Sequence, residues 1–126
     1  GKYECFLKED TTLPMMFMAD ALKATIDLME LEADKISLRS SYNVAAISFS
    51  PKDLSEEIKK YIPEFKISYK PDFRQSIAET WPQSIDDSIA RQNKGWAHSY
   101  DLPKMTEIMI KEIRAKLIQN GEKLFY

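Results

Sequence analysis

Glycine is scarce in this chain. The 126 residues include only three glycines, Gly1, Gly95 and Gly121, which lie far apart. Loops that hold a phosphate or a dinucleotide need several glycines close together, because the backbone must approach the phosphate closely. We therefore expect no P-loop and no dinucleotide-binding loop within these residues.

Cysteine and histidine are scarcer still, with one of each. Cys5 cannot form an internal disulfide, which is typical of proteins from reducing compartments, and we expect it to be a small buried apolar residue. A zinc site built from nitrogen and sulfur ligands needs more of these residues than the chain has. His98 is accordingly expected to be an ordinary surface or structural histidine.

The chain also lacks an excess of charge of one sign and any long apolar run. Its 18 Lys and Arg residues are interleaved with 20 Asp and Glu residues, and the net charge is −2, so no basic face for nucleic acid is expected. The longest apolar run, from Leu13 to Ala19, is far shorter than the roughly 20 residues that span a bilayer. We expect neither nucleic acid nor a membrane as a partner.

Periodicity predicts one small α+β domain with no regular βαβ series. Short strands are expected at Tyr3–Leu7, Met15–Ala19, Tyr42–Ala46 and Glu64–Lys70. Two helices are expected in the first half, from an Asp20 cap to about Glu30 and from a Ser50 cap to Pro63. Two more are expected in the second half, from Ser84 to Arg91 and from Leu102 to about Ile118. Gly95 is expected to be a positive-φ stop after the first of these. Residues 31–40 and Pro71–Pro82 are expected to be irregular.

Two patterns resemble catalytic motifs but have simpler explanations. Tyr100 and Lys104 match Tyr-x-x-x-Lys, in which a lysine lowers the pKa of a tyrosine base. Pro103 fits a first helical position, which leaves Tyr100 ahead of the helix, so the two side chains are not expected to share a helical face. Asp86 and Asp87 form a carboxylate pair, for which a helix N-terminus is the simpler explanation.

A longer set of residues is more specific. It comprises Asp72-Phe73-Arg74-Gln75-Ser76-Ile77-Ala78-Glu79-Thr80-Trp81-Pro82, then Ser84-Ile85-Asp86-Asp87-Ser88-Ile89-Ala90-Arg91, then Gly95-Trp96. This set resembles the C-terminal part of the epimerase-like L-threonine 3-dehydrogenases, which belong to the extended short-chain dehydrogenase/reductase superfamily. Further segments agree in order, and the resemblance extends from about Lys2 to Ile113: Leu13–Asp20, Tyr42-Asn43, Ser48–Ile58 and Asp101-Leu102 with Met105. One departure is Asn93-Lys94, where an acid and a tryptophan are expected in this family.

The resemblance implies a reaction and the parts that perform it. In that family NAD takes hydride from the β-carbon of L-threonine and 2-amino-3-ketobutyrate is formed; the cofactor fingerprint and the catalytic residues lie upstream of this region. Residues 1–126 would then be a single substrate-side lobe, a fragment without the N-terminal Rossmann domain that binds NAD. We expect the fragment alone to bind no NAD, to be inactive, and to self-associate through apolar surface such as Met15–Met18. The parent enzyme would be cytoplasmic, or in the mitochondrial matrix if its source is eukaryotic.

Four residues are the candidates for the substrate pocket under this resemblance. Trp81 offers an apolar face and one N–H donor; the other interpretation is a core tryptophan. Arg74 could steady the substrate carboxylate or a lid, or it could form a purely structural ion pair. Met16 and Met18 would wall the pocket with adaptable side chains, or else be ordinary core.

The apolar run that contains these methionines also includes Met15 and Phe17, and its side chains are expected to face the cleft in alternation. Trp96 and Tyr42 are expected to be packing residues. Two alternatives to the threonine enzyme stay open: the C-terminal part of a nucleotide-sugar epimerase or dehydratase, with which Arg74 is compatible, and a stand-alone binding module without catalytic activity.

Overall fold

The computed structural model of the chain describes residues 1–36 and 39–120, without the side chains of residues 93 and 94. It has a small mixed α/β composition. In chain order the elements are β1 Lys2–Cys5, β2 Leu13–Met15, α1 Met18–Met29, the 3₁₀ turn η1 Ala33–Lys35, β3 Ile47–Phe49, α2 Pro51–Lys59, β4 Lys66–Tyr69, α3 Phe73–Ala78, α4 Ser88–Lys94 and α5 Leu102–Gln119.

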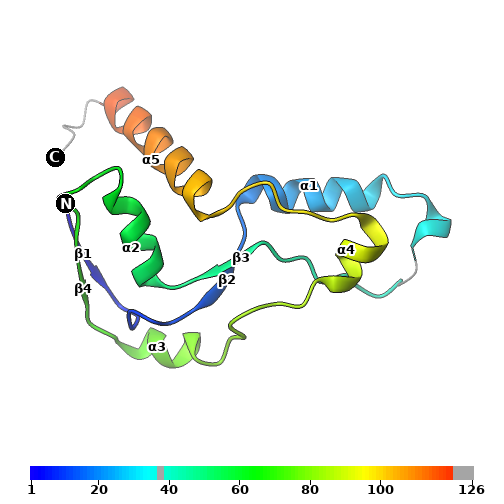
Figure 1. The fold of residues 1–126 in the computed structure, drawn as a ribbon, viewed down its shortest axis with the longest axis horizontal. Coiled ribbons are helices and arrows are strands. Elements are labelled where there is room, and N and C mark those ends of the chain that lie inside the picture. Colours follow the sequence, from blue (N-terminus) through cyan, green and yellow to red (C-terminus); the bar gives the residue numbers. More distant parts are fainter. Residues whose placement is uncertain (37–38, 121–126) are drawn as a thin grey trace.

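The described strands form two separate pairs. β1 and β4 are parallel, and β2 and β3 are antiparallel. In the ribbon, β1, β4, α2 and α3 lie toward one end and α1 and α4 toward the other, with β2 and β3 between them (Figure 1). α5 runs back from the middle and packs against α2. The architecture is therefore extended rather than built around one sheet.

The register of the parallel β1–β4 pair gives it one apolar face. Tyr3 lies opposite Ile67 and Cys5 lies opposite Tyr69. Because side chains alternate across a strand, these four residues share one face, and the lysines, the glutamate and the serine of the same strands share the other. Cys5 is buried, as predicted.

Local sequence correctly predicted the start of α2, the glycine stop of α4 and the start of α5. The Ser50 hydroxyl accepts from the Asp53 amide at 3.2 Å while the Asp53 carboxylate accepts from the Ser50 amide at 2.8 Å, which is a capping box. These contacts lower the pKa of Asp53. Gly95 ends α4 with φ 64°. Asp101 caps α5 by accepting from the Lys104 amide at 2.9 Å.

Two predicted strands are wrong. The run Met15–Ala19 leaves the strand conformation after Met15, and Met18 and Ala19 already belong to α1. Residues 42–46 form no strand, and β3 begins at Ile47. The reason is visible at Ala45, whose amide donates to the Asp87 carboxylate at 3.2 Å and whose carbonyl accepts from the indole of Trp96 at 2.9 Å. Its backbone groups are satisfied by distant side chains rather than by a neighbouring strand.

Helix boundaries were also wrong at three places. The cap of α1 is Phe17 rather than Asp20, which lies within the first turn. Pro71–Pro82 is not irregular throughout, because Asp72 caps α3 through the Arg74 amide at 2.9 Å. α4 begins at Ser88 after Asp87, not at Ser84. The linker-like part of the chain contains η1, and residues 37 and 38 lie outside the described residues.

The described residues form a very thin apolar core. Only Cys5, Ala90 and Trp96 are buried apolar residues among them. The accessible surface is 9099 Å², whereas a compact monomer of 14.6 kDa exposes roughly 6,900 Å². Much of the excess lies on helices, where apolar side chains face outward: Met18, Leu22, Ile26 and Met29 on α1, and Met109, Ile113 and Ile118 on α5. No helix of the described segments is both long and apolar enough to cross a membrane.

Candidate functional site

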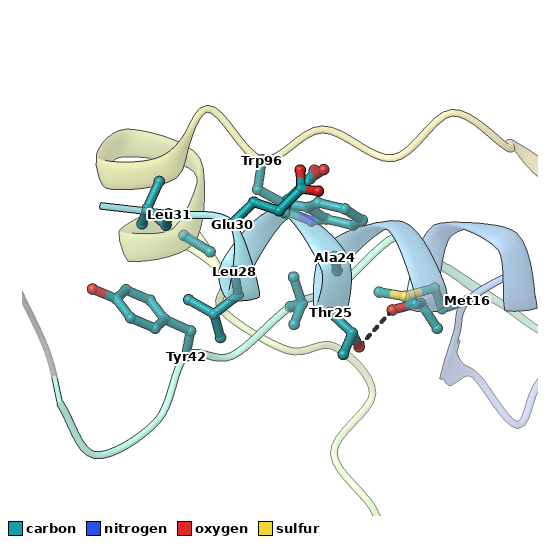
Figure 2. Close-up of a pocket in the computed structure, with 12 residues that line it drawn as sticks. Met16, Ala24, Thr25, Leu28, Glu30, Leu31, Tyr42 and Trp96 are labelled. Atoms are coloured by element: carbon teal, nitrogen blue, oxygen red, sulfur yellow. Dashed lines mark hydrogen bonds between the residues drawn. The ribbon is translucent and has the colours of Figure 1, made fainter. Parts of the chain in front are cut away.

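One hollow of about 510 Å³ lies between α1, the segment around Tyr42 and Trp96. Figure 2 shows Met16 and Tyr42 at its opposite ends, with Thr25 and Leu28 of α1 between them. Trp96 is 6% exposed and donates through its indole N–H to the carbonyl of Ala45. The lining is mostly apolar but includes the hydroxyl residues Thr25 and Tyr42 and the acidic residues Asp27 and Glu30. The hollow can accept an apolar group.

Met16 therefore lines a hollow, but Met18 does not share it. Met18 is 68% exposed at the start of α1. Between them, Phe17 packs against the ring of Tyr100 with the ring centroids 4.6 Å apart. The expected alternation of this run toward one cleft is wrong, because the chain turns from β2 into α1 within these residues.

A second hollow of about 620 Å³ lies under α2, between the two strand pairs. Its walls are almost entirely apolar and include Met15 of β2, Phe49 of β3 and Ile58 of α2. Such a space accepts hydrophobic side chains rather than a polar substrate. It marks a face of the chain that the described residues leave unfilled.

Arg74 lies on α3 and is engaged by its neighbour Asp72. Its Nε lies 3.0 Å from one carboxylate oxygen and its Nη2 lies 2.6 Å from the other. These hydrogen bonds lower the pKa of Asp72 and raise the pKa of Arg74. The guanidinium also lies 3.5 Å from the ring centroid of Phe6. The structural ion pair is thus present, and it occupies one side of the guanidinium.

Trp81 follows α3 directly, with its amide donating to the carbonyl of Ala78 at 3.1 Å. It is 59% exposed, so the interpretation of Trp81 as a core residue is wrong. Arg74 lies on α3 and Trp81 lies just after it, whereas Met16 and Met18 lie where β2 meets α1. None of the hollows described above contains members of both pairs.

No protein-family model matches the chain, but individual proteins do. Mitochondrial L-threonine 3-dehydrogenase of Bos taurus is 46% identical over 111 residues, which are 87% of this chain and 30% of that protein. The GalE-like L-threonine dehydrogenase from Cupriavidus necator, in its apo form, superposes with a TM-score of 0.86 at 51% identity over 90% of this chain and 41% of that one. The chain is homologous to a part of the L-threonine 3-dehydrogenases.

The homology places the chain within a wider group as well. An uncharacterised epimerase/dehydratase of Staphylococcus haemolyticus is 44% identical over 117 residues, which are 92% of this chain and 37% of that protein. The chain spans between 30% and 41% of the length of these three relatives. The resemblance to the epimerase-like threonine dehydrogenases is therefore confirmed, and the similarity extends to proteins of the epimerase/dehydratase group.

The two patterns that resemble catalytic motifs, Tyr100 with Lys104 and Asp86 with Asp87, have structural roles in this threonine dehydrogenase homologue. Lys104 Nζ lies 4.4 Å from the ring centroid of Tyr100 and donates to the Ser99 carbonyl at 3.0 Å, so it contacts the ring face. Asp87 accepts from Arg91 at 2.7 Å, which lowers the pKa of Asp87, and it also accepts from the Ala45 amide. Among residues 1–36 and 39–120 no cluster of His, Cys, Asp and Glu is suited to a metal ion.

Two polar residues that sequence reasoning missed hold loops in place. Asp20 is fully buried, and its carboxylate accepts from the amides of Ser99 at 2.9 Å and Tyr100 at 3.1 Å. Gln75 is buried on α3. Asp20 directly follows the apolar run Leu13–Ala19, which is a signal in the sequence, but this does not identify its distant partners; Gln75 stands between Arg74 and Ser76 and has no such signal. The departure at Asn93-Lys94 cannot be placed, since those side chains lie outside the described residues.

Proposed function

We propose that this chain is the substrate-side portion of an NAD-dependent L-threonine 3-dehydrogenase, which converts L-threonine to 2-amino-3-ketobutyrate. The observation that supports it most strongly is the identity of 46–51% to proteins of that name over about nine-tenths of the chain. NAD would supply the hydride acceptor and would be held by a Rossmann portion outside these residues. Such an arrangement agrees with the scarcity of glycine in the chain.

The role of these residues is to shape and close the amino-acid pocket. Trp81 presents an apolar indole face, which suits the methyl side of threonine, and its N–H is a donor. Arg74 keeps one side of its guanidinium for the substrate carboxylate while Asp72 fixes the other. Met16 and Met18 have flexible thioether side chains that adapt to the partner portion or to substrate.

The exposed apolar surface supports the presence of a second portion. α1 is apolar on both sides, with Ala24 and Leu28 toward the hollow and Leu22 and Ile26 outward. Lys23 and Asp27 form an exposed ion pair on this helix, but an apolar stripe such as Leu22 and Ile26 normally faces another part of the protein, so it needs a cover. The NAD-binding portion is the occupant that the proposal requires. Without it, we expect copies of the chain to self-associate, which light scattering at increasing concentration tests; a strict monomer would contradict this.

Kinetics of the complete enzyme test the role of Trp81. Trp81→Ala removes the indole face, so the KM for L-threonine should rise on the order of tenfold. Trp81→Phe keeps an aromatic face and should show a smaller rise. Tyr61→Ala, at a partly exposed aromatic residue just after α2, is the matched control and should leave the KM unchanged. Unaltered KM and kcat in Trp81→Ala would remove Trp81 from the site.

The isolated chain provides a second test. Calorimetric titration with NAD should show no binding, and threonine with NAD should produce no NADH absorbance. Turnover by these 126 residues alone would overturn the proposal. The cytoplasm, or the mitochondrial matrix for a eukaryotic source, is the compartment that we propose; the single buried cysteine agrees with a reducing compartment.

A nucleotide-sugar epimerase or dehydratase is the second candidate, favoured by the similarity to the staphylococcal epimerase/dehydratase. The ion pair with Asp72 does not separate the two candidates, because the side of the Arg74 guanidinium that Asp72 leaves open suits a diphosphate as well as a carboxylate. Thermal-shift measurements of the complete protein with threonine, NAD and UDP-sugars separate the two candidates. Stabilisation by none of these ligands would instead favour a binding module without catalytic activity.

A further inference from the structure

α3 has two chemically different sides. Phe73 and Ile77 are 74% and 52% exposed, and the exposed Trp81 follows in the turn after the helix ends at Ala78. Phe73 and Ile77 are four residues apart and therefore lie on the same side of the helix, so this outward side is apolar. Gln75 lies on the other side and is only 7% exposed. Apolar packing therefore does not hold α3 in place.

Polar contacts hold the inward side of α3 instead. The side-chain oxygen of Gln75 accepts from the backbone amide of Lys8 at 2.8 Å. Its amide nitrogen donates to the Thr11 hydroxyl and to the Glu79 carboxylate, both at 3.0 Å. Lys8 Nζ lies 2.7 Å from the Glu79 carboxylate. This ion pair lowers the pKa of Glu79 and raises the pKa of Lys8. We call Lys8, Thr11, Gln75 and Glu79 the Gln75 cluster.

The N-terminal end of α3 is attached to the same loop. The Asp72 amide donates to the Phe6 carbonyl at 3.3 Å, and the Arg74 guanidinium stacks on the Phe6 ring. The Trp81 amide in turn donates to the carbonyl of Ala78. The loop from Phe6 to Thr11 thus fixes α3, and α3 fixes the backbone from which the Trp81 side chain projects.

We propose that Gln75 is a positioning residue for Trp81, acting through the Gln75 cluster. The inference rests on the proposed function, in which Trp81 contacts the amino-acid substrate. A neutral side-chain amide is suited to this place, because it can accept from one backbone amide and donate to a hydroxyl and a carboxylate at the same time. An apolar side chain of similar size leaves the Lys8 amide and Glu79 without these partners, and it removes the hydrogen bonds of the only buried residue of α3.

Hydrogen exchange on this chain tests the structural step. In Gln75→Leu, amides of residues 73–81 should exchange on the order of tenfold faster or more, because α3 opens locally. Gln92→Leu is the matched control on the exposed side of α4 and should leave exchange in α3 unchanged. Equal exchange of residues 73–81 in Gln75→Leu and wild type would overturn the proposal.

Exchanging the two side chains gives a rescue that a general loss of stability would not show. In the double variant Gln75→Glu with Glu79→Gln, a carboxylate at 75 can accept from the Lys8 amide, and an amide at 79 can donate back to it. The net charge is unchanged. Exchange rates in α3 should return toward those of wild type. Rates as fast as in Gln75→Leu would contradict the assigned contacts.

A double-mutant cycle in the complete enzyme tests the link to Trp81. If Gln75 acts through Trp81, Gln75→Leu should raise the KM for threonine several-fold in wild type and have no further effect in Trp81→Ala. Additive effects in the double variant would overturn the positioning role. A normal KM in Gln75→Leu beside a raised KM in Trp81→Ala would overturn it while leaving the proposed function intact. A normal KM in Trp81→Ala would overturn both.

Discussion

The two tryptophans of this chain each follow a short helix, yet they are held in opposite ways. Trp96 follows α4, is 6% exposed, and has its indole N–H bonded to a distant carbonyl. Trp81 follows α3 and is 59% exposed. The side chain of Trp96 anchors the α4 region, whereas Trp81 is itself positioned by the polar contacts of α3. Within this chain, Trp81 is therefore the tryptophan that packing leaves exposed.

The helices beside them differ in the same way. α4 carries the buried Ala90 and is joined to the segment around Ala45 through Asp87. α3 carries the buried Gln75 and leaves its apolar side outward. Packing therefore dominates at α4 and hydrogen bonding at α3. This contrast predicts where substitutions affect stability and where they affect only local order.

The largest effect on stability should come from Trp96. Trp96→Ala removes the largest buried side chain and should cost about 3–5 kcal/mol in free energy of unfolding, whereas Trp81→Ala should stay within about 0.5 kcal/mol. Urea unfolding curves of both variants measure this. Because Trp96→Ala could unfold the chain, Trp96→Phe is the companion variant, with an expected loss of about 1 kcal/mol from the missing N–H donor. Equal losses of unfolding free energy in Trp96→Ala and Trp81→Ala would contradict the difference between the two tryptophans.

The buried carboxylate of Asp20 should give the next largest effect. Asp20→Ala leaves the amides of Ser99 and Tyr100 without their acceptor, so the free energy of unfolding should fall by about 1–3 kcal/mol. Asp10→Ala, at an exposed loop position, is the control and should be nearly neutral. Thermal melting of the two variants measures the difference. A neutral Asp20→Ala would mean that the loop before α5 is held by Phe17 and Tyr100 alone.

Lowering the pH should weaken the ion pairs of both α3 and α4 by the same mechanism, but the two helices should differ in how much stability they lose. The pKa of Asp87 is lowered by Arg91 and that of Glu79 by Lys8, so the charged forms stabilise the folded state. Their contribution is present above the unfolded pKa, near 4, and is lost as the pH falls below it. Urea midpoints should therefore fall between about pH 5 and pH 3.

Variants sharpen this pH comparison. Asp87→Asn should flatten the pH dependence of global unfolding, because Asp87 belongs to the packed region. Glu79→Gln should change mainly hydrogen exchange in residues 73–81 and leave the global midpoint nearly unaltered. A urea midpoint that rose on acidification would contradict the assigned direction of both pKa shifts.

The smallest effect should be at the hydroxyl of Tyr100. Like Trp96, Tyr100 acts through its ring, which contacts Phe17 and Lys104. Tyr100→Phe should change the free energy of unfolding by less than about 0.5 kcal/mol and leave threonine turnover of the complete enzyme unchanged, whereas Tyr100→Ala should destabilise clearly. A large drop in kcat for Tyr100→Phe would restore the Tyr-x-x-x-Lys motif as a catalytic candidate.

Sequence reasoning succeeded where neighbouring residues decide the structure. Ser50 with Asp53 predicted the start of α2, Gly95 predicted the end of α4, and Pro103 placed Tyr100 ahead of α5. Each of these depends on residues within one helical turn. The family resemblance succeeded for a related reason, since the block from Asp72 to Trp96 is a continuous and specific stretch of sequence.

Sequence reasoning failed where distant residues decide it. A strand was predicted around Ala45, but Asp87 and Trp96 take the backbone groups that a strand would use. Asp20 was predicted as a cap, but its carboxylate bonds to amides about 80 residues away. The four candidate site residues were expected to share one cleft, and the structure separates them into two pairs.

The sequence by itself determined the capping box of α2, the Gly95 stop of α4 and the family, because these depend on residue identity over short spans. Only the tertiary structure decided that Trp96 is buried and Trp81 is exposed, and that Gln75 fixes α3. The physical reason is that burial and buried hydrogen bonds join residues far apart in the chain, and no local pattern specifies which distant partner a polar side chain will meet.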